Sequence, residues 1–241
     1  MEEKLSAAFA NHVILANHLW LDKYTARSAR TEKCSVFINN VDPRIFQPRP
    51  PGKPAGKPVI IFPGGLQWHQ GVDIAVHAFD KLRRRIPGAE FHIYGEGNMK
   101  PSLIELAQGL GLNGSVRFFK PLRIHEIADV MAQADLGVVP KRADSFGNEA
   151  YSTKIMEFMS LGVPVVVSST RIDRHYFNDS VVRFFESGNA DALAEAMFDV
   201  LSHPEERQAM VARATDYAAQ NSWENHKTRY LDLVDSLVAR R

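Results

Sequence analysis

The sequence predicts an α/β protein built on a Rossmann-like, doubly wound parallel sheet with extra helices toward the ends of the chain. Two observations lead to this fold class. From residue 59 onward, short apolar runs rich in β-branched residues alternate with stretches of helical periodicity. Residues 59–62 and 165–167 are apolar without interruption, as in strands covered on both faces. Strands that alternate with helices imply parallel pairing through right-handed crossovers.

The predicted elements follow one another at regular spacing through this region. We expect strands at 59–62, 91–94, 116–119, 136–139, 165–167 and 181–185. Apolar stripes at spacings of three and four residues predict helices at about 72–85, 103–110, 124–131 and 153–162. Three more helices are expected at about 190–201, 204–219 and from 221 to the end, the last one capped by Asn221 and burying Trp223, Tyr230, Leu233, Val234 and Leu237.

The first fifty residues have a different character. They predict a helix, a short apolar stretch at 13–16, a second helix and a short strand at 36–38. They contain too few apolar positions to form a domain alone, so we expect the end of a larger domain or a flap packed on the rest of the chain. Residues 39–58 are dense in proline and glycine and predict a linker or hinge.

Bulk composition argues against several function classes. A net charge of +1 over 241 residues gives no strong field toward nucleic acid. The single cysteine excludes an intrachain disulfide, and the nine histidines show no metal-ligand spacing such as HExxH, so we expect no metal site. The acidic amino terminus is unlike a signal peptide, and no apolar run reaches the roughly 18 residues of a membrane span. We therefore expect a cytoplasmic protein, with peripheral contact at the inner membrane face left open.

Candidate ligand-binding residues gather at the carboxyl ends of the predicted strands, where open parallel sheets bind ligands. Two glycine-rich turns, two cationic spots and a hydroxyl-bearing helix start all fall on this edge. They are Gly64-Gly65, Gly95-Glu96-Gly97, Lys120-Pro121, Lys141-Arg142 and Ser152-Thr153. A helix amino terminus attracts anions, and glycine lets the backbone approach a ligand, so the set indicates a phosphorylated or sugar-bearing ligand.

Each feature also has a purely structural interpretation, which the sequence leaves open. The glycine pair is equally typical of a tight turn, and Lys141-Arg142 of a solvated surface pair. Trp68-His69 predicts either a cap over the sheet edge or a platform for a ring. Glu149 and Glu157 bracket the helix start eight residues apart, but Glu157 is also well placed for a surface ion pair with Lys154.

Several motifs in order resemble the carboxyl-terminal, donor-binding domain of GT-B glycosyltransferases, in particular the large family-four group. They are PGGLQWHQGVDIAVHAF, FHIYGEGNMKPSL, VRFFKPL, ADLGVVP, and the pair Glu149 and Glu157 followed by GVPVVVSS. The start of the chain is similar to the end of the family's amino-terminal domain. The resemblance thus implies a remnant of that domain with its hinge (1–50), a linker (51–58), a Rossmann-like donor-binding domain (59–220) and a crossover helix (221–241).

The resemblance also implies a role for each part of the site. Glu149 would contact the transferred sugar of a nucleotide-sugar, and Glu157 would bind the ribose hydroxyls. The backbone N–H groups at Thr153 and Lys154, next to Ser152, would cap the diphosphate. Members of the family are typically retaining enzymes that use no catalytic metal, so no cofactor is expected.

The sequence departs from this family in its first glycine turn. Relatives usually carry an arginine and a lysine there, both contacting the diphosphate, where this chain has Gly65 and Gln70. Two charge-assisted contacts of roughly 1.5–3 kcal/mol each would be lost unless other cations replace them. The candidates are Lys154, Lys141, Arg142 and His69. We favour a rearranged set of cations over an inactive site.

The sequence therefore predicts the nucleotide-sugar-binding part of a glycosyltransferase. The acceptor would be a glycan, a lipid-linked saccharide or a polysaccharide, as in polysaccharide biosynthesis for the cell envelope. Because most of the first domain is missing, an acceptor-domain partner chain is also expected. The alternatives are a non-catalytic nucleotide-sugar-binding or scaffolding domain, and a truncated or split half that is inactive alone. A nicotinamide-dependent oxidoreductase ranks low, because no GxGxxG turn follows the first strand.

Overall fold

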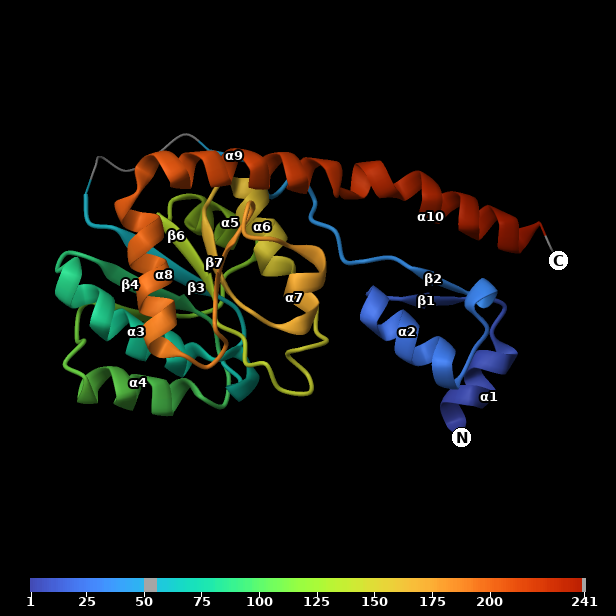
Figure 1. The fold of residues 1–241 in the computed structure, drawn as a ribbon, viewed down its shortest axis with the longest axis horizontal. Coiled ribbons are helices and arrows are strands. Elements are labelled where there is room, and N and C mark those ends of the chain that lie inside the picture. Colours follow the sequence, from blue (N-terminus) through green and yellow to red (C-terminus); the bar gives the residue numbers. More distant parts are fainter. Residues whose placement is uncertain (50–55, 240–241) are drawn as a thin grey trace.

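A computed structural model describes residues 1–49 and 56–239 of the chain (Figure 1). Its main feature is a six-stranded sheet in the order β5-β4-β3-β6-β7-β8, with every neighbouring pair parallel. The strands are β3 (Val59–Pro63), β4 (Glu90–Tyr94), β5 (Val116–Phe119), β6 (Leu136–Val139), β7 (Val165–Ser168) and β8 (Arg183–Phe185). The chain first adds strands on one side of β3, as far as β5, and then returns to add β6, β7 and β8 on its other side. The sheet is therefore doubly wound, as predicted.

Helices cover both faces of this sheet. One face packs against α3 (Val72–Arg85), α4 (Lys100–Gly109) and α8 (Ala190–Ser202), and the other against α5 (Ile124–Ala132), α6 (Thr153–Leu161) and α9 (Pro204–Gln220). Successive strand residues point to opposite cores: Ile60 and Phe62 lie in the first, and Ile61 lies in the second. All three are buried, which is why the strand is an unbroken apolar run in the sequence.

Residues 1–49 form a small unit beside this domain (Figure 1). The unit contains α1 (Glu2–Phe9), β1 (Val13–Leu15), α2 (His18–Arg27), a 3-10 turn (Thr31–Lys33) and β2 (Cys34–Val36), and the two strands pair in parallel. Its last segment enters the domain, where Val41 and Phe46 are buried in the second core. Helix α10 (Trp223–Val238) runs from α9 across to the unit, and its Tyr230 packs edge-on against Phe37.

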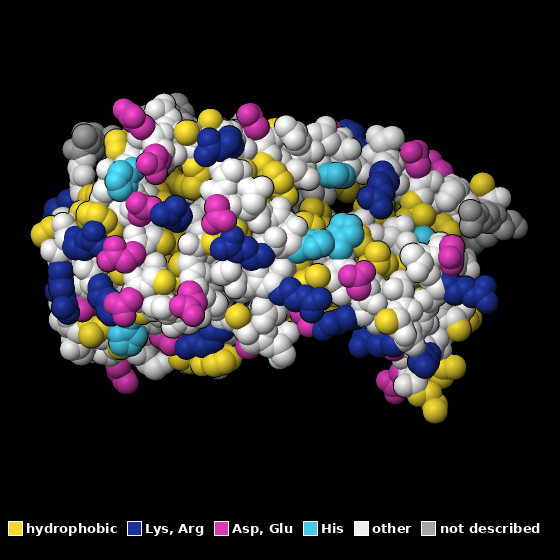
Figure 2. Space-filling view, in the orientation of Figure 1, with side chains coloured by type: hydrophobic (Ala, Val, Ile, Leu, Met, Phe, Trp, Pro, Cys, Tyr) yellow, Lys and Arg dark blue, Asp and Glu magenta, His cyan; other side chains and the backbone are white. Residues whose placement is uncertain are grey.

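Polar and aromatic contacts join the unit to the domain. The backbone N–H of His18 donates to the Tyr176 hydroxyl at 3.0 Å, and the His18 ring lies 2.8 Å from the same oxygen. The His18 and His175 rings are 5.6 Å apart, and histidine side chains gather at this junction in Figure 2. The side-chain amide of Asn17 donates to the Glu149 carbonyl at 2.9 Å. The unit therefore touches the domain next to one of the predicted site residues.

Most predicted elements are confirmed, and the differences have local causes. The helix at 72–85 and the strands at 116–119 and 136–139 have the predicted bounds. Strand β2 begins two residues earlier than predicted, because it pairs with β1 in a register that sets Val36 against Leu15. Helix α7 (Arg171–Tyr176) was not predicted, since six residues are too few to show a periodic stripe. Residues 51–55 of the predicted linker at 51–58 lie outside the described residues.

The carboxyl-terminal helix differs most from its prediction. Its N-cap is Ser222, and Asn221 instead follows the last residue of α9. The predicted buried face is wrong: Trp223 and Val234 are exposed, and none of the described residues of α10 is fully buried. The apolar stripe has helical spacing, but α10 extends past the domain core toward the small unit (Figure 1).

Candidate functional site

A cavity of about 440 Å³ opens at the carboxyl ends of β3 and β4, beside the amino terminus of α6. This is the sheet edge from which the sequence predicted ligand binding. The lining residues come from the loops after β3, β4 and β5 and from helices α5 and α6. They are Pro63, Gly64, Gly65, Tyr94, Gly95, Glu96, Pro121, Leu122, Ile127, Met131, Thr153, Lys154 and Glu157. Half of the predicted site residues are therefore brought together here: Gly64, Gly65, Thr153, Lys154 and Glu157.

The turn after β3 brings its backbone close to α6. The Gly64 N–H donates to the Tyr94 carbonyl at 2.9 Å, which extends the pairing of β3 with β4 by one residue. Gly64 has a φ of 143°, a conformation that side chains rarely adopt. A Cβ atom at this position would lie 2.4 Å from Cε of Lys154. Glycine at 64 is thus required by the turn, and a side chain here would also displace the end of the Lys154 side chain.

Lys154 points back across the cavity toward this turn. Its Nζ donates to Oε1 of Gln70 at 3.2 Å and lies 5.6 Å from the centre of the Phe62 ring. Burial lowers the pKa of Lys154, although the nearby Glu157 carboxylate opposes this shift. No ion pair joins Lys154 to Glu157 in the part of the chain that the structure describes, so the predicted alternative of a surface ion pair is wrong. Gln70 itself does not line the cavity; it holds the lysine that does.

Glu157 lines the same cavity from one turn further along α6. Burial raises the pKa of its carboxyl group, and a hydrogen bond from the Thr153 side chain and the Lys154 charge oppose the rise. Ser152 is the N-cap of α6, but its side chain makes no capping hydrogen bond. The helix start at Thr153 therefore keeps its positive end toward the cavity without a side-chain cap.

An apolar wall completes the cavity, and most of it was missed from the sequence. Tyr94 stacks on Phe119, with ring centroids 4.4 Å apart and planes inclined by 10°. Leu122 is exposed, although it is a large apolar side chain. The loops at 95–97 and 120–121 were predicted to lie at the ligand-binding edge, but Tyr94 and Leu122 beside them were not among the predicted site residues. The only available signal was position, because Tyr94 is the last residue of its strand.

Lys141 does not line the cavity. Its ammonium group lies 2.9 Å from Oδ2 of Asp173 and donates to the Ala150 carbonyl at 2.7 Å. Lys141 is 4 % exposed and Asp173 is fully buried, so the alternative of a solvated surface residue is wrong for Lys141. Burial lowers the pKa of Lys141 and raises that of Asp173, and the attraction between the two opposes both shifts.

Arg142 and the residues near it form a second group outside the cavity. Its guanidinium binds both oxygens of Asp73, at 2.9 and 2.7 Å, and lies 4.5 Å from the centre of the Trp68 ring. His69 packs edge-on against Phe146, with ring centroids 4.8 Å apart. The Trp68 ring is thus a platform, and the group that lies over it is the guanidinium of Arg142 from the same chain.

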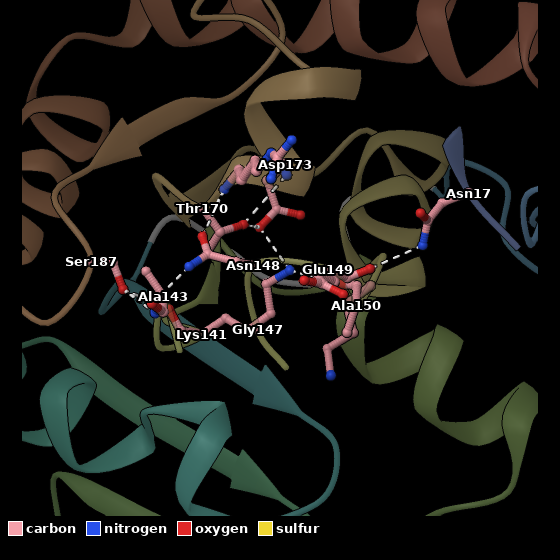
Figure 3. Close-up of polar contacts among 12 residues, drawn as sticks. Asn17, Lys141, Ala143, Gly147, Asn148, Glu149, Ala150, Thr170, Asp173 and Ser187 are labelled. Carbon is pink, nitrogen blue, oxygen red and sulfur yellow. Dashed lines mark hydrogen bonds and ion pairs between the residues drawn. The ribbon is translucent and has the colours of Figure 1, made fainter. Parts of the chain in front are cut away.

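Glu149 also lies outside the cavity lining, four residues before the start of α6. Its carboxylate forms an ion pair with Lys23 of α2, and its carbonyl accepts the hydrogen bond from Asn17. Figure 3 shows this stretch of the loop together with the residues that bind it. The two predicted glutamates therefore have different surroundings: Glu157 faces the cavity, and Glu149 faces the amino-terminal unit.

Comparison with known proteins identifies the family. The model for glycosyl transferases group 1 matches residues 43–217. The chain belongs to this family. It is 32% identical over 199 residues to a D-inositol 3-phosphate glycosyltransferase from Corynebacterium urealyticum, and the match covers 77% of this chain and 45% of that protein. It is 28% identical over 188 residues to a GDP-mannose-dependent alpha-(1-6)-phosphatidylinositol monomannoside mannosyltransferase from Mycolicibacterium smegmatis, covering 77% of this chain and 49% of that protein.

Solved structures share the fold of this group 1 chain and confirm the predicted GT-B resemblance. HepE from Anabaena, in complex with UDP and glucose, superposes with a TM-score of 0.84 at 18% identity, covering 98% of this chain and 66% of that chain. The carboxyl-terminal domain of LpcC from Francisella tularensis superposes with a TM-score of 0.64 at 18% identity, covering 75% of this chain and 97% of that one. The group 1 chain spans about half the length of the curated relatives named above.

The described part of the group 1 chain contains neither a metal-binding cluster nor a membrane-spanning helix. Within residues 1–49 and 56–239, no three or more His, Cys, Asp or Glu side chains are grouped so that they could hold a metal ion. Over the same residues, every helix is too short or too polar to cross a membrane.

Proposed function

We propose that the cavity binds the nucleotide-sugar donor substrate of a glycosyltransferase reaction. One observation carries the proposal: three chemically different surfaces line a single cavity. They are an apolar wall suited to a base, a buried carboxylate suited to ribose hydroxyls, and a lysine beside an uncapped helix start suited to a diphosphate. The names of similar proteins agree with this ligand class, since one structure holds UDP and glucose and one relative is called GDP-mannose-dependent.

Each group that lines the cavity then has a role that its position supports. The base lies along the wall beside Tyr94, and Glu157 accepts hydrogen bonds from the ribose hydroxyls. The backbone N–H groups at the start of α6 bind the diphosphate, and Lys154 supplies the positive charge that Gly65 and Gln70 lack. Glu149 lies outside the cavity lining, four residues before the helix, and the family resemblance assigns it the contact with the transferred sugar.

The reaction we propose is sugar transfer with retention of the anomeric configuration and without a metal. The leaving diphosphate gains negative charge as the bond to the sugar breaks. Lys154 and the amino terminus of α6 are the groups placed to stabilise that charge. The configuration of the product, followed by NMR, tests retention, and activity that survives a chelator tests the metal-free mechanism.

A glycan, a lipid-linked saccharide or a polysaccharide is the proposed acceptor, held by a domain that packs on the amino-terminal unit. Many of the exposed large apolar side chains lie on that unit and on α10: Leu5, Phe9, Ile14, Trp20, Leu231, Val234 and Val238. A two-stranded parallel sheet is marginal alone and is normally covered on both faces. An acceptor-binding domain, on the same protein or a partner chain, would cover these residues, and a lipid-linked acceptor would bring the cytoplasmic protein to the membrane surface.

The contact with an acceptor-binding domain can be tested by co-expression with the polypeptides encoded beside this chain. We expect one of them to copurify in a fixed ratio, and Ile14→Asp and Val234→Asp to reduce its recovery. Recovery that is unchanged in both variants would contradict this surface.

Calorimetric titration with UDP-glucose, GDP-mannose and ADP-glucose tests the donor substrate. We expect one of the three nucleotides to bind clearly more tightly than the others. Glu157→Ala should weaken binding of the matching nucleoside, while Lys81→Met, which removes an exposed lysine paired with Asp191 between α3 and α8, should change nothing. If none of the three binds at high protein concentration, the proposed function is wrong.

A second candidate function is a nucleotide-sugar-binding domain without catalysis. It is favoured by the uncharged pair Gly65 and Gln70, and by the ion pair that engages the Glu149 carboxylate with Lys23. The two candidates differ in turnover. Release of free sugar or of a glycosylated product from a bound nucleotide-sugar, abolished by Glu149→Ala, would favour the enzyme.

A further inference from the structure

The loop between β6 and α6 is fixed at three successive carbonyl groups around Glu149. The Asn148 carbonyl accepts from the backbone N–H of Ile172 at 3.1 Å. The Glu149 carbonyl accepts from Asn17 at 2.9 Å, and the Ala150 carbonyl accepts from Lys141 at 2.7 Å. Figure 3 shows these contacts approaching the loop from different elements. The backbone beneath Glu149 is therefore held on both sides, and mainly its side chain is left to adjust.

The Lys141–Asp173 pair is the buried part of this support. Asp173 lies on α7, where its Oδ2 also accepts from the Thr170 hydroxyl at 2.6 Å. Its Oδ1 has no hydrogen-bond partner among the described residues, so Lys141 is the main group that compensates the negative charge of the carboxylate. A charged pair that is shielded from water interacts strongly and tolerates little displacement. Lys141 thus links the carbonyl that follows Glu149 to a helix anchored in the core.

Asn148 supplies a second link from the same helix. Its side-chain oxygen accepts from the Arg171 N–H at 2.9 Å, and its side-chain nitrogen donates to the Ala143 carbonyl at 2.8 Å. Residues before and after Glu149 are therefore both tied to α7, one directly and one through Lys141. No corresponding network supports Glu157 among the described residues, since α6 itself carries that side chain.

We propose that Lys141 and Asp173 are positioning residues that set Glu149 for contact with the transferred sugar. The inference rests on the proposed function, because it assigns a purpose to the support of a sugar-binding glutamate. Lys141 is then not a ligand of the diphosphate, since its ammonium group is buried and already bound to Ala150 and Asp173. The pair should influence how well the sugar is bound without changing how well the nucleotide is bound.

The test compares the affinities for UDP and UDP-glucose, or for GDP and GDP-mannose if that pair binds the wild type. The affinity for the nucleotide-sugar divided by the affinity for its nucleoside diphosphate isolates the contribution of the sugar. We expect Glu149→Ala to lower this ratio about tenfold, as for loss of a hydrogen bond to a charged group. Asp173→Asn should lower the ratio by a similar factor, leave the affinity for the nucleoside diphosphate unchanged, and add nothing when combined with Glu149→Ala.

A second variant guards against misfolding, because a single change leaves one buried charge uncompensated. Lys141→Met combined with Asp173→Asn removes both charges and keeps the side-chain volumes similar. We expect this double variant to bind the nucleoside diphosphate normally and to show a lowered ratio of the two affinities. The single variant Lys141→Arg, which keeps the charge, should keep part of the wild-type ratio.

The outcomes separate the two proposals. If the wild type binds none of the nucleotides, the proposed function fails. If the wild type binds and the double variant keeps the wild-type ratio, the positioning role is overturned. An equal loss of affinity for the nucleoside diphosphate and its sugar would also overturn it, since that result indicates a general structural role.

Discussion

The sharpest test of the proposed site concerns the single cation that lines the cavity from α6. Lys154→Met removes the positive charge and keeps most of the side-chain length. Its ammonium group has three protons, and Gln70 accepts one of them at 3.2 Å. A diphosphate can therefore bind Lys154 without first displacing an ion pair. We expect the variant to lose about 2 kcal/mol of diphosphate binding, a roughly 30-fold rise in Kd, as for one hydrogen bond to a charged group.

Calorimetry with three ligands measures this loss: UDP-glucose, UDP and uridine, or their guanosine counterparts. We expect the first two to bind roughly 30-fold more weakly to Lys154→Met and uridine to bind as before. The nucleoside contacts Glu157 and the apolar wall, which the substitution does not alter. Equal weakening of uridine would refute the assignment, because it would mean that the lysine supports the cavity and not the diphosphate.

A relocated charge provides the matching gain of function. Because Nζ of Lys154 lies within hydrogen-bond distance of Gln70, an ammonium group carried by residue 70 reaches nearly the same place. We expect Gln70→Lys in the Lys154→Met background to recover most of the lost affinity for UDP-glucose. Gln70→Met in the same background is the matched control and should recover none.

Three further predictions concern the surroundings of the site. The raised pKa of Glu157 means that its carboxylate is protonated at a higher pH than in an ordinary glutamate, so UDP-glucose affinity should fall as the pH is lowered toward that pKa, while Glu157→Gln gives a flat profile by calorimetry. Lys23→Met should raise the affinity for UDP-glucose up to about fivefold without affecting UDP, because it frees the Glu149 carboxylate from a partly exposed ion pair worth at most ~1 kcal/mol; an equal effect on both ligands would contradict this. Gly64→Ala should lower the free energy of unfolding by roughly 1–3 kcal/mol and weaken UDP binding, but should weaken it no further in the Lys154→Met background.

The fold could be predicted because burial on both faces leaves a clear trace in the sequence. Strands such as β3 and β7 are continuous apolar runs, since alternate residues serve two separate cores. The trace fails where burial is shared with few neighbours. Helix α10 carries an apolar stripe with helical spacing, yet Val234 on that stripe is exposed. Spacing indicates which residues share a face, but not whether another element covers that face.

The site was predicted in part, for a related reason. Gly64 was predicted because it lies in a glycine-rich turn at the carboxyl end of a strand, and Lys154 and Glu157 were predicted because they match a motif of the resembled family. Tyr94 was missed because an aromatic residue at the end of a buried strand looks the same whether it faces a core or a cavity. Only the three-dimensional arrangement distinguishes the two, through the empty space beside its ring.

Lys141 and Lys154 show what finally assigns a cation to a ligand. Lys141 follows β6 and Lys154 is the second residue of α6, and the sequence offered both as replacements for the missing charges, with Lys154 as the leading candidate. Lys141 meets a buried acid, Asp173, which lies on a helix too short to predict. Lys154 instead donates to the neutral Gln70, and among the described residues no ion pair engages its ammonium group, so its charge is available to a ligand. Gln70 lies where the family resemblance predicted a lysine, and the ammonium group of Lys154 lies within hydrogen-bond distance of it. An ammonium group beside a helix start, without an ion pair among the described residues, is the arrangement expected of the proposed diphosphate site.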